Sequence, residues 1–232
     1  MYKYCIKISD AKEFAKAAEL GVYNIEASFP LETYTPNELE DLRDLLIDSG
    51  MRIVLLDTVL DPEDKENIRR LFLGAHLLNV ENVKITPKDT SDLSYVYAVS
   101  KAMSIPVMIE NKSGTWLSDE SALTKAIDGS ENAGIIFNPF EFVKEKAHPF
   151  LHSFTKSHAK SRIKFLRTND GLYTGEATKP GKGSAEIKEM ASILLARNFD
   201  GYFMLTPCDE NNGDEYGCAA QLSYMKRIFK LM

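Results

Sequence analysis

The sequence predicts a single α/β domain of the (β/α)8 TIM-barrel class that spans residues 1–232. Short β-rich runs alternate with amphipathic runs along the whole chain. Eight such pairs follow one another without a linker or a shift in composition, and barrels of up to about 250 residues form one domain. An open doubly wound sheet is the alternative. No GxGxxG motif follows any predicted strand, however, which removes the main support for a dinucleotide-binding fold.

The predicted strands are short apolar runs that end in a polar residue or a proline. In chain order they are KYCIKIS, YNIEAS, RIVLLD, NVKITP, PVMIEN, AGIIFNP, RIKFLRT and GYFMLTP. The helical pattern is clearest after the seventh strand, where apolar residues from Ile187 to Leu195 fall on one face. Thr35-Pro36-Asn37-Glu38 predicts a capping box with proline at the first helical position, and Asp61-Pro62 predicts a similar start for the third helix.

Composition and charge narrow the class of protein. The chain is 44% hydrophobic and 27% charged, and its net charge of −6 comes without a basic stripe, so we expect no nucleic-acid partner. No run approaches the roughly 18 apolar residues of a membrane span, and the N-terminus lacks the pattern of a signal peptide. We therefore expect a soluble cytoplasmic protein without a membrane partner. Cys5, Cys208 and Cys218 predict reduced thiols rather than a disulfide or zinc framework.

Strand alternation predicts which polar side chains face the axis of the barrel. In NVKITP, Val83 and Ile85 must face the helices, so Lys84 and Thr86 point inward. The same reasoning turns a set of residues near the carboxyl ends of the strands inward, where barrel active sites lie. That set is Lys7, Glu26, Asp57, Lys84, Glu110, Asn138, Arg167 and Thr206.

Six of these inward residues are charged, and isolated buried charges cost several kcal/mol, so they must be paired or line a solvated pocket. A purely structural ion network and a binding site both remain open. The fourth, sixth and eighth strands end in Thr86-Pro87, Asn138-Pro139 and Thr206-Pro207. Proline ends the strand ladder and holds the preceding residue extended, so it either only stops the strand or fixes a polar side chain at the rim of a pocket.

Several stretches resemble the xylose isomerase-like superfamily of barrels, which includes sugar isomerases and epimerases and the endonuclease IV type of abasic-site nuclease. The resemblance covers most of the chain and rests on PVMIENKSGTW, GIIFNPFEFVKEKAHP, RIKFLRTNDG, KPGKGSAEI and NFDGYFMLTP. In that family a divalent metal is typically held by Glu, Asp, His and Glu at the ends of strands five to eight, and two acids move protons between neighbouring carbons of a sugar.

By position, the resemblance assigns these ligand places to Glu110, Asn138, Arg167 and Thr206. Only Glu110 matches, since an amide, a guanidinium and a hydroxyl replace the other three ligands. We therefore expect no metal and no other cofactor. We expect Arg167 to supply the positive charge that a metal would bring and to pair with Glu110, with Asn138 and Thr206 completing the hydrogen bonds.

The Gly-rich loop KPGKGS precedes the seventh helix and offers backbone N–H groups, so it predicts either an anion site or a simple tight turn. Asn169 and Lys182, after the seventh strand and in this loop, join Glu26, Asp57, Asn138 and Thr206 as predicted substrate-binding residues. Glu110, Lys84 and Arg167 are the predicted catalytic residues. A homo-oligomer is left open.

Three functions follow as alternatives, so the sequence leaves open whether the protein is an enzyme. The first is a metal-independent isomerase or epimerase for a small sugar or polyol derivative, with Glu110 as proton carrier and Lys84 or Arg167 polarising a carbonyl. The second is a barrel that has lost catalysis and binds a small carbohydrate or a partner. The third is a lyase or aldolase-type enzyme that forms a Schiff base on Lys84.

Overall fold

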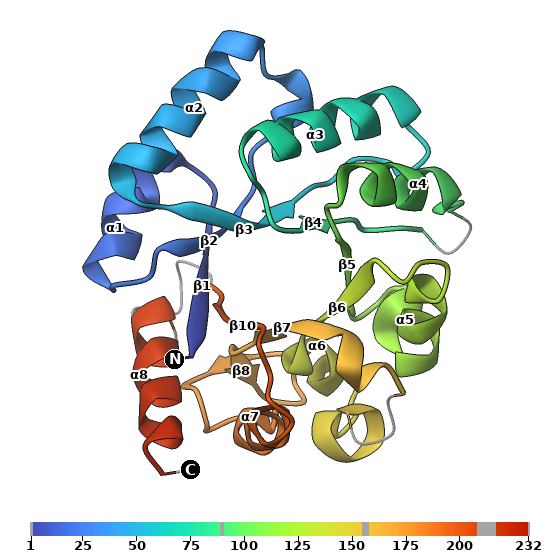
Figure 1. Cartoon of the computed structure of the whole chain (residues 1–232). Helices are drawn as coiled ribbons and strands as arrows, with labels where there is room; N and C mark the ends of the chain where they lie inside the picture. Colours follow the sequence, from blue (N-terminus) through green and yellow to red (C-terminus); the bar gives the residue numbers. More distant parts are fainter. Residues whose placement is uncertain (1, 89–90, 155–157, 208–216, 232) are drawn as a thin grey trace. The chain divides into compact units, whose positions relative to one another are not determined.

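The computed structural model describes residues 2–88, 91–154, 158–207 and 217–231 (Figure 1). Cys208 lies outside the described residues, so the prediction for its thiol is not addressed. Cys5 and Cys218 are thiols that form no disulfide within the described residues, in agreement with the prediction. No helix in the described part of the chain is long and apolar enough to cross a membrane.

The predicted fold class is confirmed, because eight parallel strands form a closed barrel in the order β1-β10-β7-β6-β5-β4-β3-β2. All eight predicted strands are present, most of them one or two residues shorter than expected. The barrel strands are β1 Lys3–Ile8, β2 Asn24–Ala27, β3 Arg52–Asp57, β4 Val83–Lys84, β5 Val107–Glu110, β6 Ala133–Phe137, β7 Ile163–Arg167 and β10 Tyr202–Leu205. A small antiparallel hairpin, β8 Asp170–Gly171 with β9 Ala177–Thr178, follows β7.

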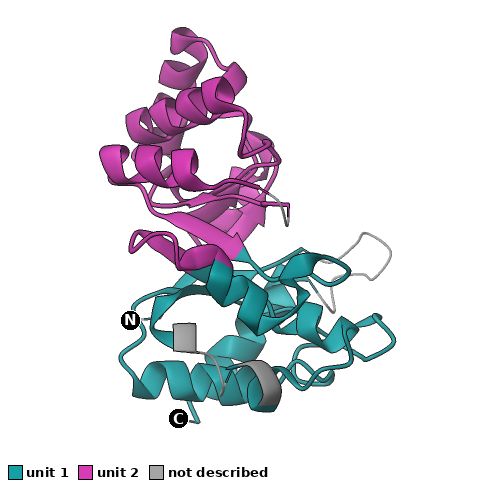
Figure 2. Cartoon of the chain, turned by 90° about the vertical axis from the view of Figure 1, so that its right-hand side faces the viewer, with its two compact units in different colours: residues 1–4, 110–125, 135–232 teal, residues 5–109, 126–134 magenta. Residues whose placement is uncertain are grey.

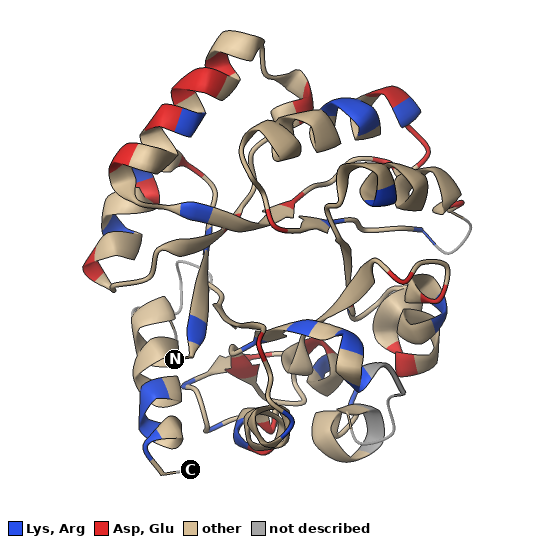
Figure 3. Ribbon diagram, viewed as in Figure 1, with Lys and Arg blue, Asp and Glu red and all other residues tan. Residues whose placement is uncertain are grey.

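Helices follow the strands along the chain (Figure 1). The α-helices are α1 Phe14–Glu19, α2 Pro36–Ser49, α3 Lys65–Leu77, α4 Ser94–Met103, α5 Glu120–Ile127, α6 Pro139–Lys144, α7 Ile187–Ala196 and α8 Cys218–Phe229. Short helical turns occur at η1 Ala11–Glu13, η2 Leu31–Thr33, η3 Trp116–Ser118, η4 Pro149–Phe154 and η5 His158–Arg162. In α3 and α5, residues of both charge signs occur together (Figure 3).

Two of the predicted helix starts can be compared with the structure. The capping box of α2 is present, since the Thr35 side chain accepts from the N–H of Glu38 and the Glu38 carboxylate accepts from the N–H of Thr35. The predicted start of the third helix at Asp61-Pro62 is wrong. Asp61 Oδ1 accepts from the N–H of Glu63 and closes a turn, and Asp64, whose side chain accepts from the N–H of Asn67, caps α3 instead.

The chain divides into two compact units (Figure 2). The first, here called the Arg167 unit, comprises residues 1–4, 110–125 and 135–232, and the second, here called the Asp57 unit, comprises residues 5–109 and 126–134. Each unit is described by itself below. The assignment of residues 1–232 to a single domain stays a prediction.

The core of the Asp57 unit is largely aliphatic. Its strands β2 and β3 pair in parallel with a register shift between Ile25 and Glu26, and Ile25 and Leu55 are fully buried. Helix α3 packs on η2, where a Cβ on Gly74 would lie 3.1 Å from Leu31 Cβ. Helix α3 and the turn η2 therefore meet through close-packed apolar side chains.

The Arg167 unit has an aromatic core. Phe137 of β6 packs against Phe142 of α6 with ring centroids 5.2 Å apart, and Phe165 of β7 stacks on Tyr202 of β10 at 5.4 Å. All five residues of β6 are buried, which is expected for a parallel strand covered on both faces. This core holds the carboxyl ends of β6, β7 and β10, from which the polar side chains of the candidate site project.

Candidate functional site

The Arg167 unit brings four of the predicted site residues into direct contact. Glu110 at the end of β5, Asn138 after β6, Arg167 at the end of β7 and Thr206 after β10 form what we call the Arg167 cluster. Arg167 is only 3% exposed and Glu110 has an 11% exposed side chain. The sequence predicted this set of contacts, while the roles of its members in binding or catalysis stay predictions.

The pair of Arg167 and Glu110 has a two-pronged geometry. Arg167 Nε donates to Glu110 Oε1 at 2.8 Å, and its NH2 donates to Oε2 at 3.0 Å. Arg167 NH1 donates to the hydroxyl of Thr206 at 3.3 Å. Such paired, charge-assisted hydrogen bonds offset the cost of removing both ions from water, and they fix the plane of the guanidinium.

Asn138 contributes an unsatisfied acceptor to this cluster. Its Nδ2 donates to Glu110 Oε1 at 2.9 Å. Because a carboxylate can only accept, this contact dictates the orientation of the amide and turns Oδ1 away from Glu110. Asn138 Oδ1 is buried, in a residue that is 7% exposed, and it has no hydrogen-bond partner among the residues that the structure describes. A buried carbonyl oxygen without a donor costs about 1–3 kcal/mol, so a ligand hydroxyl that supplied the donor would be favoured.

Side-chain amides hold the backbone of Asn138 and Thr206 where the prolines end the ladders. Asn111 donates from Nδ2 to the carbonyl of Asn138 at 2.8 Å, and its Oδ1 accepts from the N–H of Asn138 at 2.7 Å. Gln221 of α8 does the same for Thr206, at 2.7 Å and 3.0 Å, and also accepts from the hydroxyl of Thr168. We call these the two amide clasps. Each replaces a pair of strand hydrogen bonds, so both rim residues are fixed beyond the ends of their strands.

The Asp57 unit contains a second ionic cluster, here called the Asp57 cluster, made of Lys7, Glu26, Asp57 and Lys84. Asp57 lies between two ammonium groups, with Lys7 Nζ at 2.8 Å from Oδ2 and Lys84 Nζ at 3.1 Å from Oδ1. Glu26 is fully buried and its Oε1 lies 4.0 Å from Lys7 Nζ. Thr86, after β4 in the same unit, is exposed.

The charges in the Asp57 cluster determine its protonation. Burial by itself would raise the pKa of Asp57, but the positive charges of Lys84 and Lys7 and their hydrogen bonds outweigh it and lower the pKa below its ordinary value. Asp57 is therefore a carboxylate at neutral pH. Its contact also stabilises the charged form of Lys84, whereas a Schiff base requires the neutral amine.

Backbone N–H groups of the loop after β7 donate hydrogen bonds to a carboxylate of the same loop. Both carboxylate oxygens of Asp170 accept from this loop: Oδ1 from the N–H groups of Gly171 at 2.9 Å and Ala185 at 3.0 Å, and Oδ2 from those of Gly181 at 2.8 Å and Gly183 at 3.0 Å. The anion site considered for KPGKGS thus already holds a carboxylate of the chain itself. Helix α7 begins after Glu186 in the left-handed conformation, without a side-chain cap.

The other two predicted binding residues lie on either side of this arrangement. Asn169 sits between the buried residues Thr168 and Asp170, and its Oδ1 is a second buried acceptor for which the described residues supply no donor. Lys182 is exposed, and its backbone N–H donates to the carbonyl of Lys179. In the described structure Lys182 makes no hydrogen bond with the Arg167 cluster.

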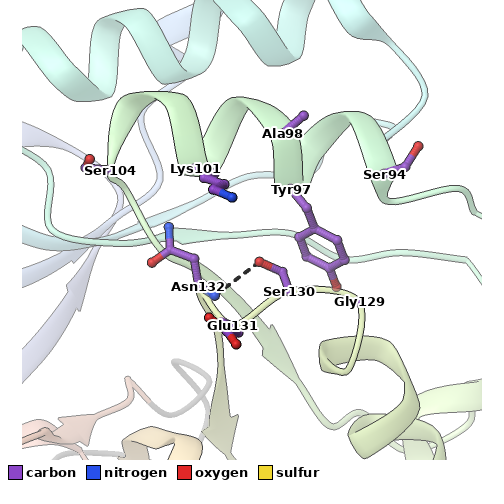
Figure 4. A pocket seen from close by; sticks show the side chains of 9 residues that line it. All are labelled: Ser94, Tyr97, Ala98, Lys101, Ser104, Gly129, Ser130, Glu131 and Asn132. Atoms are coloured by element: carbon purple, nitrogen blue, oxygen red, sulfur yellow. Dashed lines mark hydrogen bonds between the residues drawn. The ribbon is translucent and has the colours of Figure 1, made fainter.

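Two hollows of the surface lie away from the predicted residues. One, of about 660 Å³ in the Asp57 unit, lies between α4 and the segment 129–132, with Tyr97, Lys101 and Asn132 in its lining (Figure 4). The other, of about 370 Å³ in the Arg167 unit, is lined by residues that include Lys164 and Arg197. Neither lining contains a member of the two ionic clusters. The charged and polar side chains at the strand ends, rather than the size of a cavity, therefore define the candidate site.

The Arg167 cluster does not fit a divalent metal. Its four side chains comprise one carboxylate, one amide, one hydroxyl and one guanidinium, and both oxygens of the carboxylate already accept from Arg167. Hard cations take several oxygen ligands that balance their charge, and a guanidinium can neither ligate nor lose its proton. In the described residues no group of three or more His, Cys, Asp and Glu side chains could hold a metal ion.

No protein-family model matches the chain, and no curated protein matches it in sequence. Solved structures do match. A D-tagatose 3-epimerase-like protein is 17% identical with a TM-score of 0.71 and covers 97% of both chains. A xylose isomerase domain protein from Planctomyces limnophilus is 12% identical with a TM-score of 0.74, over 99% of this chain and 95% of the other.

A xylose isomerase-like TIM barrel protein from Mycobacterium smegmatis, solved with magnesium, is 16% identical with a TM-score of 0.71, over 95% of this chain and 88% of the other. At these identities the similarity shows the fold alone. The chain therefore has the fold of the xylose isomerase-like TIM barrels, the group that the sequence resemblance indicated.

Sequence reasoning missed several residues that build the site. Asp170, Asn111 and Gln221 were not singled out, although each is buried and holds the backbone of a predicted site segment. Asp170 had a usable signal, because an aspartate followed by a loop with several glycines often accepts from exposed N–H groups. Gln221 had none, since it lies in α8, 15 residues after Thr206.

Proposed function

We propose that the protein binds a small sugar or polyol derivative at the Arg167 cluster and that it does so without a divalent metal. The observation that carries this proposal is the buried Oδ1 of Asn138, which has no donor within the described part of the chain and lies beside the engaged pair of Glu110 and Arg167. A polyol has many hydroxyl groups, each able to donate one hydrogen bond and to accept others. Asn169 Oδ1 offers a second buried acceptor in the same unit.

The fold supports the class of ligand. Barrel binding sites form at the carboxyl ends of the strands, and Glu110, Arg167 and the residues after β6 and β10 lie there. The matching solved structures include proteins named as epimerase-like and as xylose isomerase-like. Neutral hydrogen-bonding groups around one closed ion pair suit a neutral, hydroxylated ligand better than a charged one.

Isomerase or epimerase chemistry is the second candidate, and the presence of Glu110 beside a guanidinium favours it. In that reaction Glu110 takes a proton from a carbon next to the ligand carbonyl, and Arg167 stabilises the charge that develops on the carbonyl oxygen. Both oxygens of Glu110 accept from Arg167, so proton transfer requires this pair to shift when the ligand binds. Binding demands no such shift, and we therefore place it first.

Titration calorimetry against a panel of aldoses, ketoses and polyols tests binding. Asn138→Ala should lower the affinity for the best ligand by about tenfold, the loss of one good hydrogen bond. Asn132→Ala is the matched control, because that amide is also part-buried but bonds Ser100 in the other unit. Equal losses in both variants, or no ligand in the panel, would contradict the proposal.

Incubation of the ligand in D₂O separates binding from catalysis. Deuterium that appears at a ligand carbon in the presence of the wild-type protein, and not with Glu110→Gln, would establish proton transfer by Glu110. A bound ligand that gains no deuterium would identify a binding protein instead. The Schiff-base lyase has no comparable support, since Lys84 is held in an ion pair with Asp57.

A further inference from the structure

The loop between β7 and α7 has the form of an anion-binding nest. Four backbone N–H groups, those of Gly171, Gly181, Gly183 and Ala185, converge on one point, where they meet the two oxygens of Asp170 at 2.8–3.0 Å. Convergent backbone N–H groups of this kind bind phosphate and carboxylate groups in many proteins. Asp170 is 3% exposed, so the bound carboxylate is enclosed.

The glycines of this loop are required by the close approach. Gly181 has a φ of +79°, and a Cβ there would lie 2.4 Å from the ring of Tyr224. A Cβ on Gly183 would lie 2.3 Å from Asp170 Oδ1. At position 181 the positive φ and Tyr224 disfavour a larger residue, and at position 183 Asp170 and the backbone of Gly171 leave no room for one.

We propose that Asp170 is the resident anion of this nest and that it makes the site selective for neutral, non-phosphorylated ligands. The proposal rests on the function proposed above and adds the substrate class. The nest and the guanidinium of Arg167 are two groups of the Arg167 unit whose chemistry suits a phosphate. Asp170 already occupies the nest, and Glu110 already pairs with the guanidinium. A phosphate placed at either group would displace a buried carboxylate, whereas a neutral sugar or polyol displaces neither.

The two neighbours of Asn169 are both held by hydrogen bonds. The loop is closed on Asp170, and the hydroxyl of Thr168 lies within hydrogen-bond distance of the carbonyl of Met204 and of Gln221 Oε1. The backbone of Asn169 is therefore anchored on both sides.

Inorganic phosphate is the probe for the nest. Asp170→Ala empties it, so 20 mM phosphate should raise the unfolding temperature of this variant by about 3 °C or more relative to chloride at equal ionic strength. The wild type should show no such rise. Asp119→Ala is the matched control, because it also removes a carboxylate from backbone N–H groups, those of Ser121 and Ala122, but at an exposed helix start. If Asp170→Ala is unfolded in chloride, phosphate should restore its far-UV circular dichroism.

The phosphate experiment decides whether Asp170 is the anion that occupies the nest. A rise or a restored fold in Asp170→Ala alone supports the proposal. An equal rise in the wild type or in Asp119→Ala, or no effect of phosphate on Asp170→Ala, overturns it.

Calorimetry on the wild type with neutral sugars and polyols and with their phosphate esters tests the substrate class. The neutral member of each pair should bind at least about tenfold more tightly. Tighter binding of an ester would overturn the selectivity. Absence of binding by either member would instead refute the proposed function, and the phosphate experiment would still decide the nest.

Discussion

Replacing Glu110 by glutamine tests the central ion pair. The change keeps the shape of the side chain but removes its charge, and it places an amide NH2 where Glu110 Oε2 accepts from Arg167 NH2 at 3.0 Å. Arg167, 3% exposed, would then retain a full charge after losing the negative partner and one of the two carboxylate acceptors. Breaking a buried pair costs about 3–5 kcal/mol, and we expect about 3 kcal/mol because the glutamine oxygen still accepts from Nε and water reaches the 11% exposed carboxylate.

Urea unfolding measures this loss as a fall in the free energy of unfolding, and a thermal melt should show a decrease of about 6–12 °C. Asp119→Asn is the control, since Asp119 caps α5 through Oδ1 alone and asparagine keeps that oxygen, so its cost should stay below about 1 kcal/mol. The double variant Glu110→Gln, Arg167→Met should be more stable than the sum of the single changes predicts by about 1–3 kcal/mol. Additive effects, or equal losses in Glu110→Gln and Asp119→Asn, would refute the reasoning.

Three further predictions concern pH, lysine chemistry and metal. Because the folded-state pKa of Asp57 is lowered, its contribution to stability is complete above the unfolded pKa near 3.9 and is lost as the pH falls through the lower folded value. Asp57→Asn should therefore reduce the loss of unfolding free energy measured between pH 6 and pH 2.5. An unchanged pH dependence would contradict the ion pairs of Asp57. Borohydride reduction with small carbonyl compounds should leave Lys84 unmodified. A reduced adduct found on Lys84 by mass spectrometry would instead support a Schiff-base lyase or aldolase function. In calorimetry, wild-type protein stripped of metal with a chelator should bind Mn²⁺ only weakly. The triple variant Asn138→Asp, Arg167→His, Thr206→Glu should bind Mn²⁺ stoichiometrically. A tight site in the wild type that requires Glu110 would disprove the role assigned to Arg167.

The fold could be predicted because the signal is repeated along the chain. Each strand carries its own apolar run and polar end, and the mismatch at one helix start, Asp61-Pro62 instead of Asp64, does not alter the order of elements. Local hydrogen bonding decided that start, since Asp61 satisfies the N–H of Glu63 in a turn before the helix begins.

The pairing of Glu110 with Arg167 could also be predicted, because strand alternation turns both inward and opposite charges near each other must pair. The residues that hold the backbone of the site could not be predicted. Gln221 and Asn111 act through backbone groups far away or on the next strand, and such contacts depend on side-chain orientation that no periodicity encodes. The loop at KPGKGS showed a similar limit, since its N–H groups were recognised but their internal partner Asp170 was not.

The two amide clasps hold the main chain at positions 138 and 206 without using the side chains of these two residues. At positions 138 and 206 the main chain is held by Asn111 and Gln221, through atoms that every amino acid except proline possesses. The side chains at these two positions are therefore not needed to hold their own main chain, and they remain available for contacts with Glu110, Arg167 and a ligand. Substitution of either side chain should leave the main chain in place, so the same framework can present different hydrogen-bonding groups to a ligand at these two points.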